Sequence, residues 1–294
     1  MTDDASRAAS WVLAATILGS SMAFIDGSVV GVALPVVQAD LGATVSAAQW
    51  VAEMNTLLLG TLILVGGSLG DFLGRRRVFS WGVALLALGS AWAALVPSMG
   101  QLIAARGVAG VGTALLVPNS LALIGATFDG PARGRAVGTW SGLTSAVSAL
   151  APVAAGWLTE RISWRAVFVI NLPLAAAVLA IALLRMRHDG GAEEHHALDL
   201  PGAALAILAL GGLVFGLIEG PVRGWGAAPV LLALAGGVLF LALFLLRERR
   251  ARAPMVPLGL FRSPTFSGVN LLTFLLYGGL YTVSFYLPFN LIQV

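Results

Sequence analysis

Residues 47–97 read AAQWVAEMNTLLLGTLILVGGSLGDFLGRRRVFSWGVALLALGSAWAALVP, and this stretch decides the class of fold. It holds two apolar runs, 47–70 and 78–97, separated by a short segment with Asp71 and three consecutive arginines. A run of about 20 apolar residues is long enough to cross a bilayer as an α-helix. In lipid, backbone groups must be hydrogen bonded within such a segment. The stretch therefore predicts two transmembrane helices joined by a tight polar turn.

Apolar runs of similar length recur along the whole chain. Hydrophobic residues make up 58% of its 294 residues and charged residues 11%, whereas a soluble domain carries about 25% charged residues. The runs are too long and too uniformly apolar for the strands of a membrane barrel. We expect an all-α, polytopic membrane helical bundle with nine spans: 11–37, 47–70, 78–97, 99–126, 134–158, 164–184, 199–219, 228–246 and 265–291.

The placement of the arginines predicts how the chain is oriented. With the N-terminus inside, the inner segments hold 13 of the 17 basic residues, the outer segments hold three, and Arg106 lies within a span. Positive charge concentrates on the cytoplasmic side of membrane proteins. We therefore expect a plasma (inner) membrane protein with a cytoplasmic N-terminus. Basic residues scattered between apolar runs indicate the lipid bilayer, and not a nucleic acid, as partner.

The residue inventory argues against several kinds of chemistry. The chain has no cysteine, which excludes disulfides and thiolate metal sites. Glu193, Glu194, His195 and His196 are adjacent on a glycine-containing loop. Such neighbours rarely converge on one ion, so a solvated linker is the favoured interpretation. We find no nucleotide-binding loop and no set for covalent catalysis, and we expect no enzyme activity, no metal and no cofactor.

Two charged residues lie deep inside predicted spans. Asp26 is midway along the first span, and Arg106 is within the span 99–126. Ionisable groups at this depth are costly and usually face a bundle interior or a water-filled cavity. Burial disfavours the charged form of a carboxylate, so Asp26 is a candidate for taking up and releasing a proton. The alternatives are a structural partner for a hydroxyl or an arginine at Asp26, and a helix-to-helix anchor at Arg106.

Three predicted helices carry small residues at every fourth position. Such stripes let helix backbones approach closely in lipid. They indicate either generic packing or smooth seams along which helices can rock. The stripes are Gly19, Ala23, Gly27 and Gly31; Gly66, Gly70 and Gly74; and Gly138, Gly142 and Ala146.

The charged turn after the second span has a specific composition. Glycine permits a tight turn, aspartate can bond turn amides, and the arginines hold the turn in the cytoplasm. A plain topogenic arginine cluster is the alternative. The segment resembles motif A of the major facilitator superfamily, Gly-x-x-x-Asp-(Arg/Lys)-x-Gly-Arg-Arg, which implies a gating or conformational role. The matching residues are Gly67, Asp71, Gly74, Arg75 and Arg76, with Phe72 in place of the usual basic residue.

Further segments resemble motifs of the same superfamily. Residues 24–35 are similar to the helix-1 motif of the fourteen-helix drug:proton antiporters, with Gly31 in place of an asparagine. Residues 106–114 resemble motif B, whose arginine is associated with proton coupling, and residues 163–173 resemble the opening of helix 6. The antiporter motif C, Gly-Pro-x-x-Gly-Gly, is matched in degenerate form. Its residues here are Ala151, Pro152, Ala155 and Gly156.

The resemblance implies a domain organisation. We expect a six-helix transporter half over 1–184, a linker with two extra helices over 185–263, and the first helix of an incomplete second half over 264–294. In that last helix, a polar stripe predicts cavity lining, and an interfacial aromatic belt is the alternative. The stripe comprises Asn270, Thr273, Tyr277, Tyr281 and Ser284. We interpret the sequence as the N-terminal two-thirds of a longer transporter.

The function implied is secondary active transport by alternating access. We expect proton-coupled efflux of drugs or other amphipathic small molecules, with Asp26 and Arg106 in proton coupling. Two alternatives remain open at this point. One is a non-transporting membrane fragment or assembly partner, and the other is a metabolite uniporter or symporter, which the degenerate motif C favours.

Overall fold

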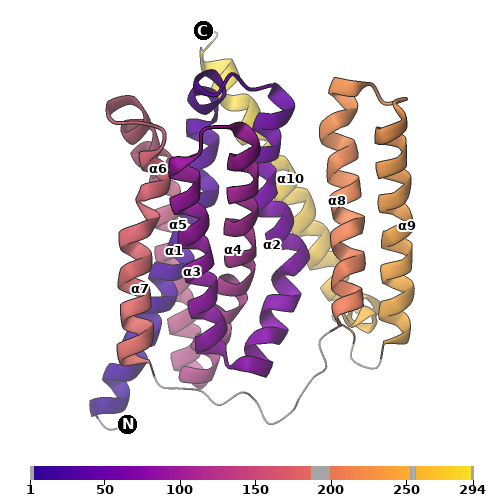
Figure 1. The fold of residues 1–294 in the computed structure, drawn as a ribbon. Helices are drawn as coiled ribbons and strands as arrows, with labels where there is room; N and C mark the ends of the chain where they lie inside the picture. The colour runs from indigo at the N-terminus through magenta and orange to yellow at the C-terminus, as the bar shows by residue number, and fades with distance from the viewer. Residues whose placement is uncertain (1–2, 187–198, 252–253, 255, 293–294) are drawn as a thin grey trace. The chain divides into compact units, whose positions relative to one another are not determined.

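The computed structural model describes residues 3–186, 199–251, 254 and 256–292 (Figure 1). Within these residues the fold is all-α and contains no strand, as predicted. The helices are α1 (Asp3–Asp40), α2 (Val45–Leu73), α3 (Arg75–Leu95), α4 (Met99–Thr127), α5 (Gly130–Arg161), α6 (Ala166–Val169), α7 (Asn171–Arg185), α8 (Leu200–Arg223), α9 (Ala228–Arg250), the 3₁₀ turn η1 (Leu258–Arg262) and α10 (Pro264–Ile292).

The nine predicted spans coincide with helices, with one difference. The span 164–184 is broken at Ile170 into α6 and α7. Pro173 has no N–H to donate to the carbonyl four residues earlier, at Val169, where α6 ends. In the described part of the chain, eight helical segments are long and apolar enough to cross a membrane. The ninth predicted span forms α10, whose side chains are described as far as Gly279.

Local signals explain several helix ends. Thr44 caps α2 by accepting a hydrogen bond from the amide of Ala47 at 3.2 Å, and Asp199 caps α8 by accepting from the amide of Gly202 at 2.9 Å. Gly74 has φ of 95°, a conformation that costs glycine little, so α2 turns directly into α3. The tight turn predicted between the second and third spans is thereby confirmed.

The chain forms two compact units, Met1–Phe244 and Leu245–Val294. In the first unit α4 packs against α2 and α3, α1 packs against α5 and α7, and α8 packs against α2 (Figure 1). In the second unit the end of α9 continues through η1 into α10, and Glu248 accepts a hydrogen bond from the amide of Val256 at 2.7 Å. The predicted division at 184 and 263 stays a prediction.

Glycines form close seams on both sides of α4. A side chain on Gly66 or Gly70 of α2 would collide with Ala114 or Asn119, and one on Gly82 of α3 would lie 2.6 Å from the amide of Leu116. Gly66 and Gly70 of the α2 stripe therefore form a packing seam, whereas Gly74 forms the turn to α3. In α1 a side chain at Gly19 would lie 2.9 Å from the ring of Phe79, whereas one at Gly27 or Gly31, or at Gly138 or Gly142 of α5, would meet no atom of the described chain within 4 Å; at these last four positions the predicted seam stays a prediction.

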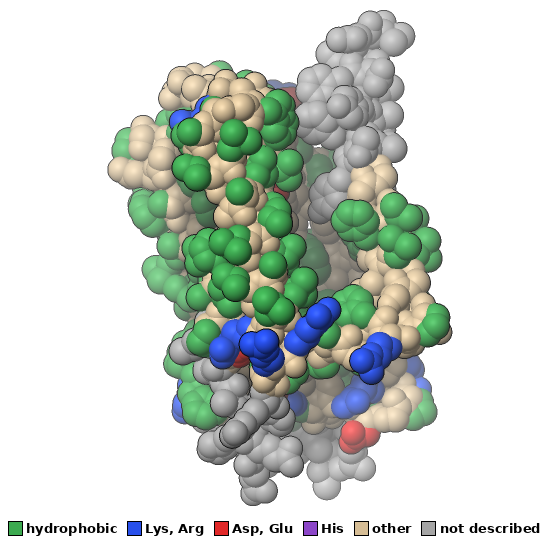
Figure 2. Space-filling view, turned by 90° about the vertical axis from the view of Figure 1, so that its right-hand side faces the viewer, with side chains coloured by type: hydrophobic (Ala, Val, Ile, Leu, Met, Phe, Trp, Pro, Cys, Tyr) green, Lys and Arg blue, Asp and Glu red, His purple; other side chains and the backbone are tan. Residues whose placement is uncertain are grey.

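The outer surface of the helices is apolar. Figure 2 shows hydrophobic side chains along the helices of one face, with most of the arginine side chains in view near one end. On α3, Trp81, Leu88 and Trp92 are 47%, 62% and 42% exposed and follow one another at helical spacing. A water-soluble protein would bury such a stripe, so these residues face lipid.

Candidate functional site

A buried carboxylate lies at the centre of the helix bundle. Asp26 of α1 is fully buried. Its Oδ2 atom accepts hydrogen bonds from Nη1 of Arg106 and from Nδ2 of Asn55, the latter at 2.7 Å, and its Oδ1 atom accepts from Nδ2 of Asn171 at 3.3 Å. Asp26 and Arg106, the two charged residues predicted to lie deep inside membrane spans, are 80 positions apart in sequence. They form an ion pair inside the membrane-spanning part of the molecule.

Arg106 is the largest fully buried side chain of the described residues, with 2% of it exposed. Besides Asp26, its guanidinium bonds the carbonyl of Val51 through Nε at 3.3 Å. The motif B glycine makes this approach possible, because a side chain on Gly110 would lie 3.0 Å from the Cα atom of Asn55. A small residue one turn after Arg106 therefore brings α2 within reach of the ion pair.

Sequence reasoning missed two members of this network. Asn55 is a polar residue in an otherwise apolar run, and the Ser90 hydroxyl accepts a hydrogen bond from Asn171 Nδ2 at 3.1 Å. Asn171 itself lies in the stretch that resembled helix 6. We name the set Asp26, Asn55, Ser90, Arg106 and Asn171 the polar core; it joins α1, α2, α3, α4 and α7. The available signal was an asparagine or serine in the middle of an apolar span.

The electrostatics of the polar core are balanced. Removing a carboxylate and a guanidinium from water costs several kcal/mol per ion, and only mutual pairing with further hydrogen bonds offsets that cost. Each oxygen of Asp26 has at least one donor. The structure thus contains the arginine partner that was the structural alternative for Asp26. Any change in the charge of one partner would leave the other buried and unpaired.

The motif A residues lie at the α2–α3 turn and do not contact the polar core. Arg75 donates to Asp71 Oδ1 through Nε at 3.0 Å and Nη2 at 2.9 Å, and through Nη1 to the carbonyl of Ala122 at 3.4 Å. Arg76 donates to the carbonyls of Ala182 and Leu183 at 2.7 and 3.0 Å. The two arginines therefore tie the turn to the ends of α4 and α7.

Two glycines of the predicted motifs are not needed for space in this structure. A side chain at Gly67 of motif A would make ordinary contact with Pro118 at 3.8 Å, and one at Gly156 of motif C would make ordinary contact with Val32 at 3.9 Å. Ala151 of motif C is buried. Together with Ala155 it borders an apolar pocket of about 170 Å³ between α1 and α5.

The polar stripe of α10 belongs to the second compact unit. Asn270 and Thr273 donate to backbone carbonyls of their own helix, those of Phe266 and Val269, each at 2.8 Å. Tyr277 is 59% exposed. The predicted cavity-lining role of these three residues stays a prediction. The side chains of Tyr281 and Ser284, and the segment with Glu193 to His196, lie outside what the structure describes; no cluster of His, Cys, Asp and Glu that could hold a metal occurs within the described residues.

A second buried carboxylate, which the sequence analysis did not single out, attaches α8 to α2. Glu219 accepts hydrogen bonds from Ser46 Oγ at 2.5 Å and Trp50 Nε1 at 3.1 Å, and it pairs with Arg223. The rings of Trp50 and Phe215 lie 6.0 Å apart between the same helices. Helix α8 is thus attached to α2 by specific polar bonds.

The fold and motifs define a multi-pass membrane protein, and residues 16–293 match the family described as Major Facilitator Superfamily. The chain belongs to this family. Its fold is similar to that of the peptide transporter POT in complex with sulfate, with a TM-score of 0.61, 17% sequence identity, and coverage of 86% of this chain and 57% of that one.

The chain is similar to known resistance proteins of this family. It is 36% identical to the methylenomycin A resistance protein of Bacillus subtilis, over 94% of this chain and 60% of the relative. It is also 36% identical to the tetracenomycin C resistance and export protein of Streptomyces glaucescens, over 94% of this chain and 52% of the relative. The chain therefore spans between about half and three-fifths of the length of these curated relatives.

Proposed function

We propose that the whole protein is a proton-coupled exporter of amphipathic, drug-like small molecules that works by alternating access. The observation that carries the proposal is the Asp26–Arg106 pair, buried where five helices of the six-helix part meet. Similarity to resistance and export proteins supports the direction of transport and the substrate class. The clustered arginines support a cytoplasmic N-terminus in the plasma membrane.

The proposed cycle depends on the pairing of opposite charges in the polar core. Protonation of Asp26 removes one charge of the pair and leaves Arg106 without its counter-ion. An unpaired buried charge is strongly unfavourable, so the protonated carrier favours an arrangement of helices in which Arg106 gains water or another partner. Loss of the proton restores the pair. Coupling follows because the proton binds the two arrangements with different affinity.

The contacts of the motif A residues form a proposed gate at the turn between α2 and α3. Asp71 and Arg75 are partly exposed, at 52% and 33% of their side chains, so their bond can be exchanged for other partners at low cost. The Arg76 bonds to α7 are buried and hold the turn in place. We expect the Asp71–Arg75 pair to rearrange during the cycle while the Arg76 bonds persist.

The experiment separates a proton-carrying Asp26 from a structural one. Whole protein is reconstituted in vesicles, and export of a cationic dye is measured with and without an imposed pH gradient. The variants are Asp26→Asn, Arg106→Gln and the double variant. Each single variant leaves one buried group unpaired, so it is expected to lose folded protein as well as transport. The double variant removes both charges and leaves residue 26 beside the amides of Asn55 and Asn171, so it is expected to recover folded protein.

The double variant decides the question. If Asp26 carries the proton, the double variant folds but shows at least about a tenfold loss of gradient-driven export, because no titrating group couples the gradient to the helix arrangement. Gradient-driven export at the wild-type rate in that variant would reduce the pair to a structural role. Wild-type dye transport that does not respond to the gradient would instead favour a uniporter.

A further inference from the structure

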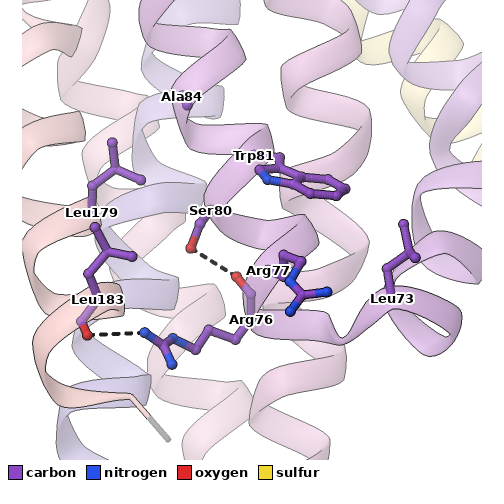
Figure 3. A pocket seen from close by; sticks show the side chains of 8 residues that line it. All are labelled: Leu73, Arg76, Arg77, Ser80, Trp81, Ala84, Leu179 and Leu183. Atoms are coloured by element: carbon purple, nitrogen blue, oxygen red, sulfur yellow. Dashed lines mark hydrogen bonds between the residues drawn. The ribbon is translucent and has the colours of Figure 1, made fainter. Parts of the chain in front are cut away.

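A pocket of about 320 Å³ lies at the arginine-rich end of α3, away from the polar core. Figure 3 shows its walls, which come from the end of α2, the first turns of α3 and the last turns of α7. The residues that matter to its chemistry are Leu73, Arg76, Arg77, Trp81, Leu179 and Leu183. Among the described residues no acidic side chain lines the pocket, so the charge of this lining is positive.

Along α3, the side of the helix at the pocket changes from charged to apolar, as the environment does from the surface of a membrane to its interior. Arg77, Trp81, Ala84 and Leu88 lie at helical spacing on one side of α3, and they run from charged through aromatic to apolar. Over these residues the helix rises about 16 Å. Trp81 and Leu88 are 47% and 62% exposed, and Leu183 on the α7 wall is 64% exposed. A tryptophan between an arginine and apolar residues marks the boundary between headgroups and hydrocarbon.

The three consecutive arginines have different partners. Arg75 pairs with Asp71, and Arg76 is buried and donates to two carbonyls at the end of α7. Arg77 is exposed, and no hydrogen bond or ion pair to its side chain occurs within the described residues; Figure 3 shows it beside Trp81. Arg77 is therefore the guanidinium available to an anion in this pocket.

We propose that this pocket binds an anionic phospholipid, with the phosphate on Arg77 and one acyl chain along Leu179 and Leu183. Basic pockets between transmembrane helices bind anionic headgroups, and each basic residue near the surface contributes about 1 kcal/mol. The indole of Trp81 packs at the level of the glycerol backbone. A soluble phosphate compound lacks the acyl chain that the apolar wall requires, so the lipid, and not the free anion, is the occupant.

The test measures lipid retained by purified whole protein. Protein is exchanged into mixed micelles containing phosphatidylglycerol or phosphatidylcholine, and bound lipid is counted by native mass spectrometry. The variants are Arg77→Gln, Arg77→Lys and Ala84→Phe, the last of which narrows the apolar end. Arg135→Gln is the matched control, because Arg135 is an exposed arginine near the start of α5 that does not line the pocket.

We expect phosphatidylglycerol to be retained in preference to phosphatidylcholine. Arg77→Gln should lower its apparent affinity about fivefold, which is the loss of about one surface charge. Arg77→Lys should keep most of the affinity, Ala84→Phe should lower it, and Arg135→Gln should not change it. Equal retention by the wild type and Arg77→Gln, or an equal loss in Arg135→Gln, would overturn the proposal. So would competition by glycerol phosphate at concentrations equal to those of the lipid. Folding of each variant is checked by its elution as a monodisperse species.

Discussion

Polar side chains in the membrane-spanning part act by pairing with one another. The polar core places a guanidinium and two amides within 3.3 Å of the Asp26 carboxylate, while Glu219 collects a hydroxyl, an indole and a guanidinium. In each case the acid would be costly if it were alone. A single residue of this kind therefore controls the contact between helices far apart in the sequence.

Replacement of Glu219 by alanine is expected to weaken the attachment of α8 to α2. The change leaves the buried Ser46 hydroxyl and the half-buried Trp50 indole without their acceptor. The unmade hydrogen bond of the buried hydroxyl alone costs about 1–3 kcal/mol. The thermal unfolding midpoint should fall measurably. Glu160→Ala is the control, because Glu160 is exposed at the end of α5, and it should change stability by less than about 0.5 kcal/mol. Equal midpoints for the two variants would show that the Glu219 bonds contribute nothing.

At the scale of elements, the central helix α4 is held by small residues on its neighbours. Gly66 and Gly70 of α2 and Gly82 and Gly89 of α3 meet α4 without room for a methyl group. Lipid offers no hydrophobic drive for helix association, so close van der Waals contact and interhelical hydrogen bonds take its place. Asn119 adds one such bond, from Nδ2 to the carbonyl of Gly66 at 2.8 Å.

Adjacent glycines of α2 should respond differently to substitution by alanine. Gly66→Ala places a methyl group against the backbone of Ala114, and Gly70→Ala places one against Asn119. Overpacking of this kind costs about 1–3 kcal/mol. Gly67→Ala has space and should be close to neutral, although Gly67 belongs to motif A. Thermal unfolding in detergent measures all three, and a Gly67→Ala variant as unstable as the other two would contradict the packing explanation.

At the scale of the whole molecule, the basic residues concentrate in alternate connecting segments. The last turn of α9 carries Arg247, Arg249 and Arg250, and the turn between α2 and α3 carries three arginines. The turn between α8 and α9 carries a single nearby arginine, Arg223. This asymmetry is the basis of the proposed orientation.

Topology reporters test the orientation. Fusions at Ala251 should report the cytoplasm, and fusions at Gly226, in the turn between α8 and α9, should report the opposite side. Because the chain has no cysteine, single cysteines introduced at the same positions give an independent reading with a membrane-impermeant thiol reagent. The reversed pattern at both positions would refute a cytoplasmic N-terminus.

The sequence by itself determined that this is a membrane protein, how many long helices it has and to which family it belongs. These properties depend on hydrophobicity summed over about 20 consecutive residues and on short motifs at fixed spacing, such as Gly67 to Arg76. Only the tertiary structure decided that Asp26 pairs with Arg106, that Asn55 and Ser90 complete the polar core, and that Glu219 anchors α8. The bonded residues in those contacts are 29 to 173 positions apart in the sequence. Which helix faces meet depends on how whole helices pack, and glycines that face α4 set that packing. The pattern of residues along one helix indicates which of its faces is buried, but it does not indicate which other helix packs against that face.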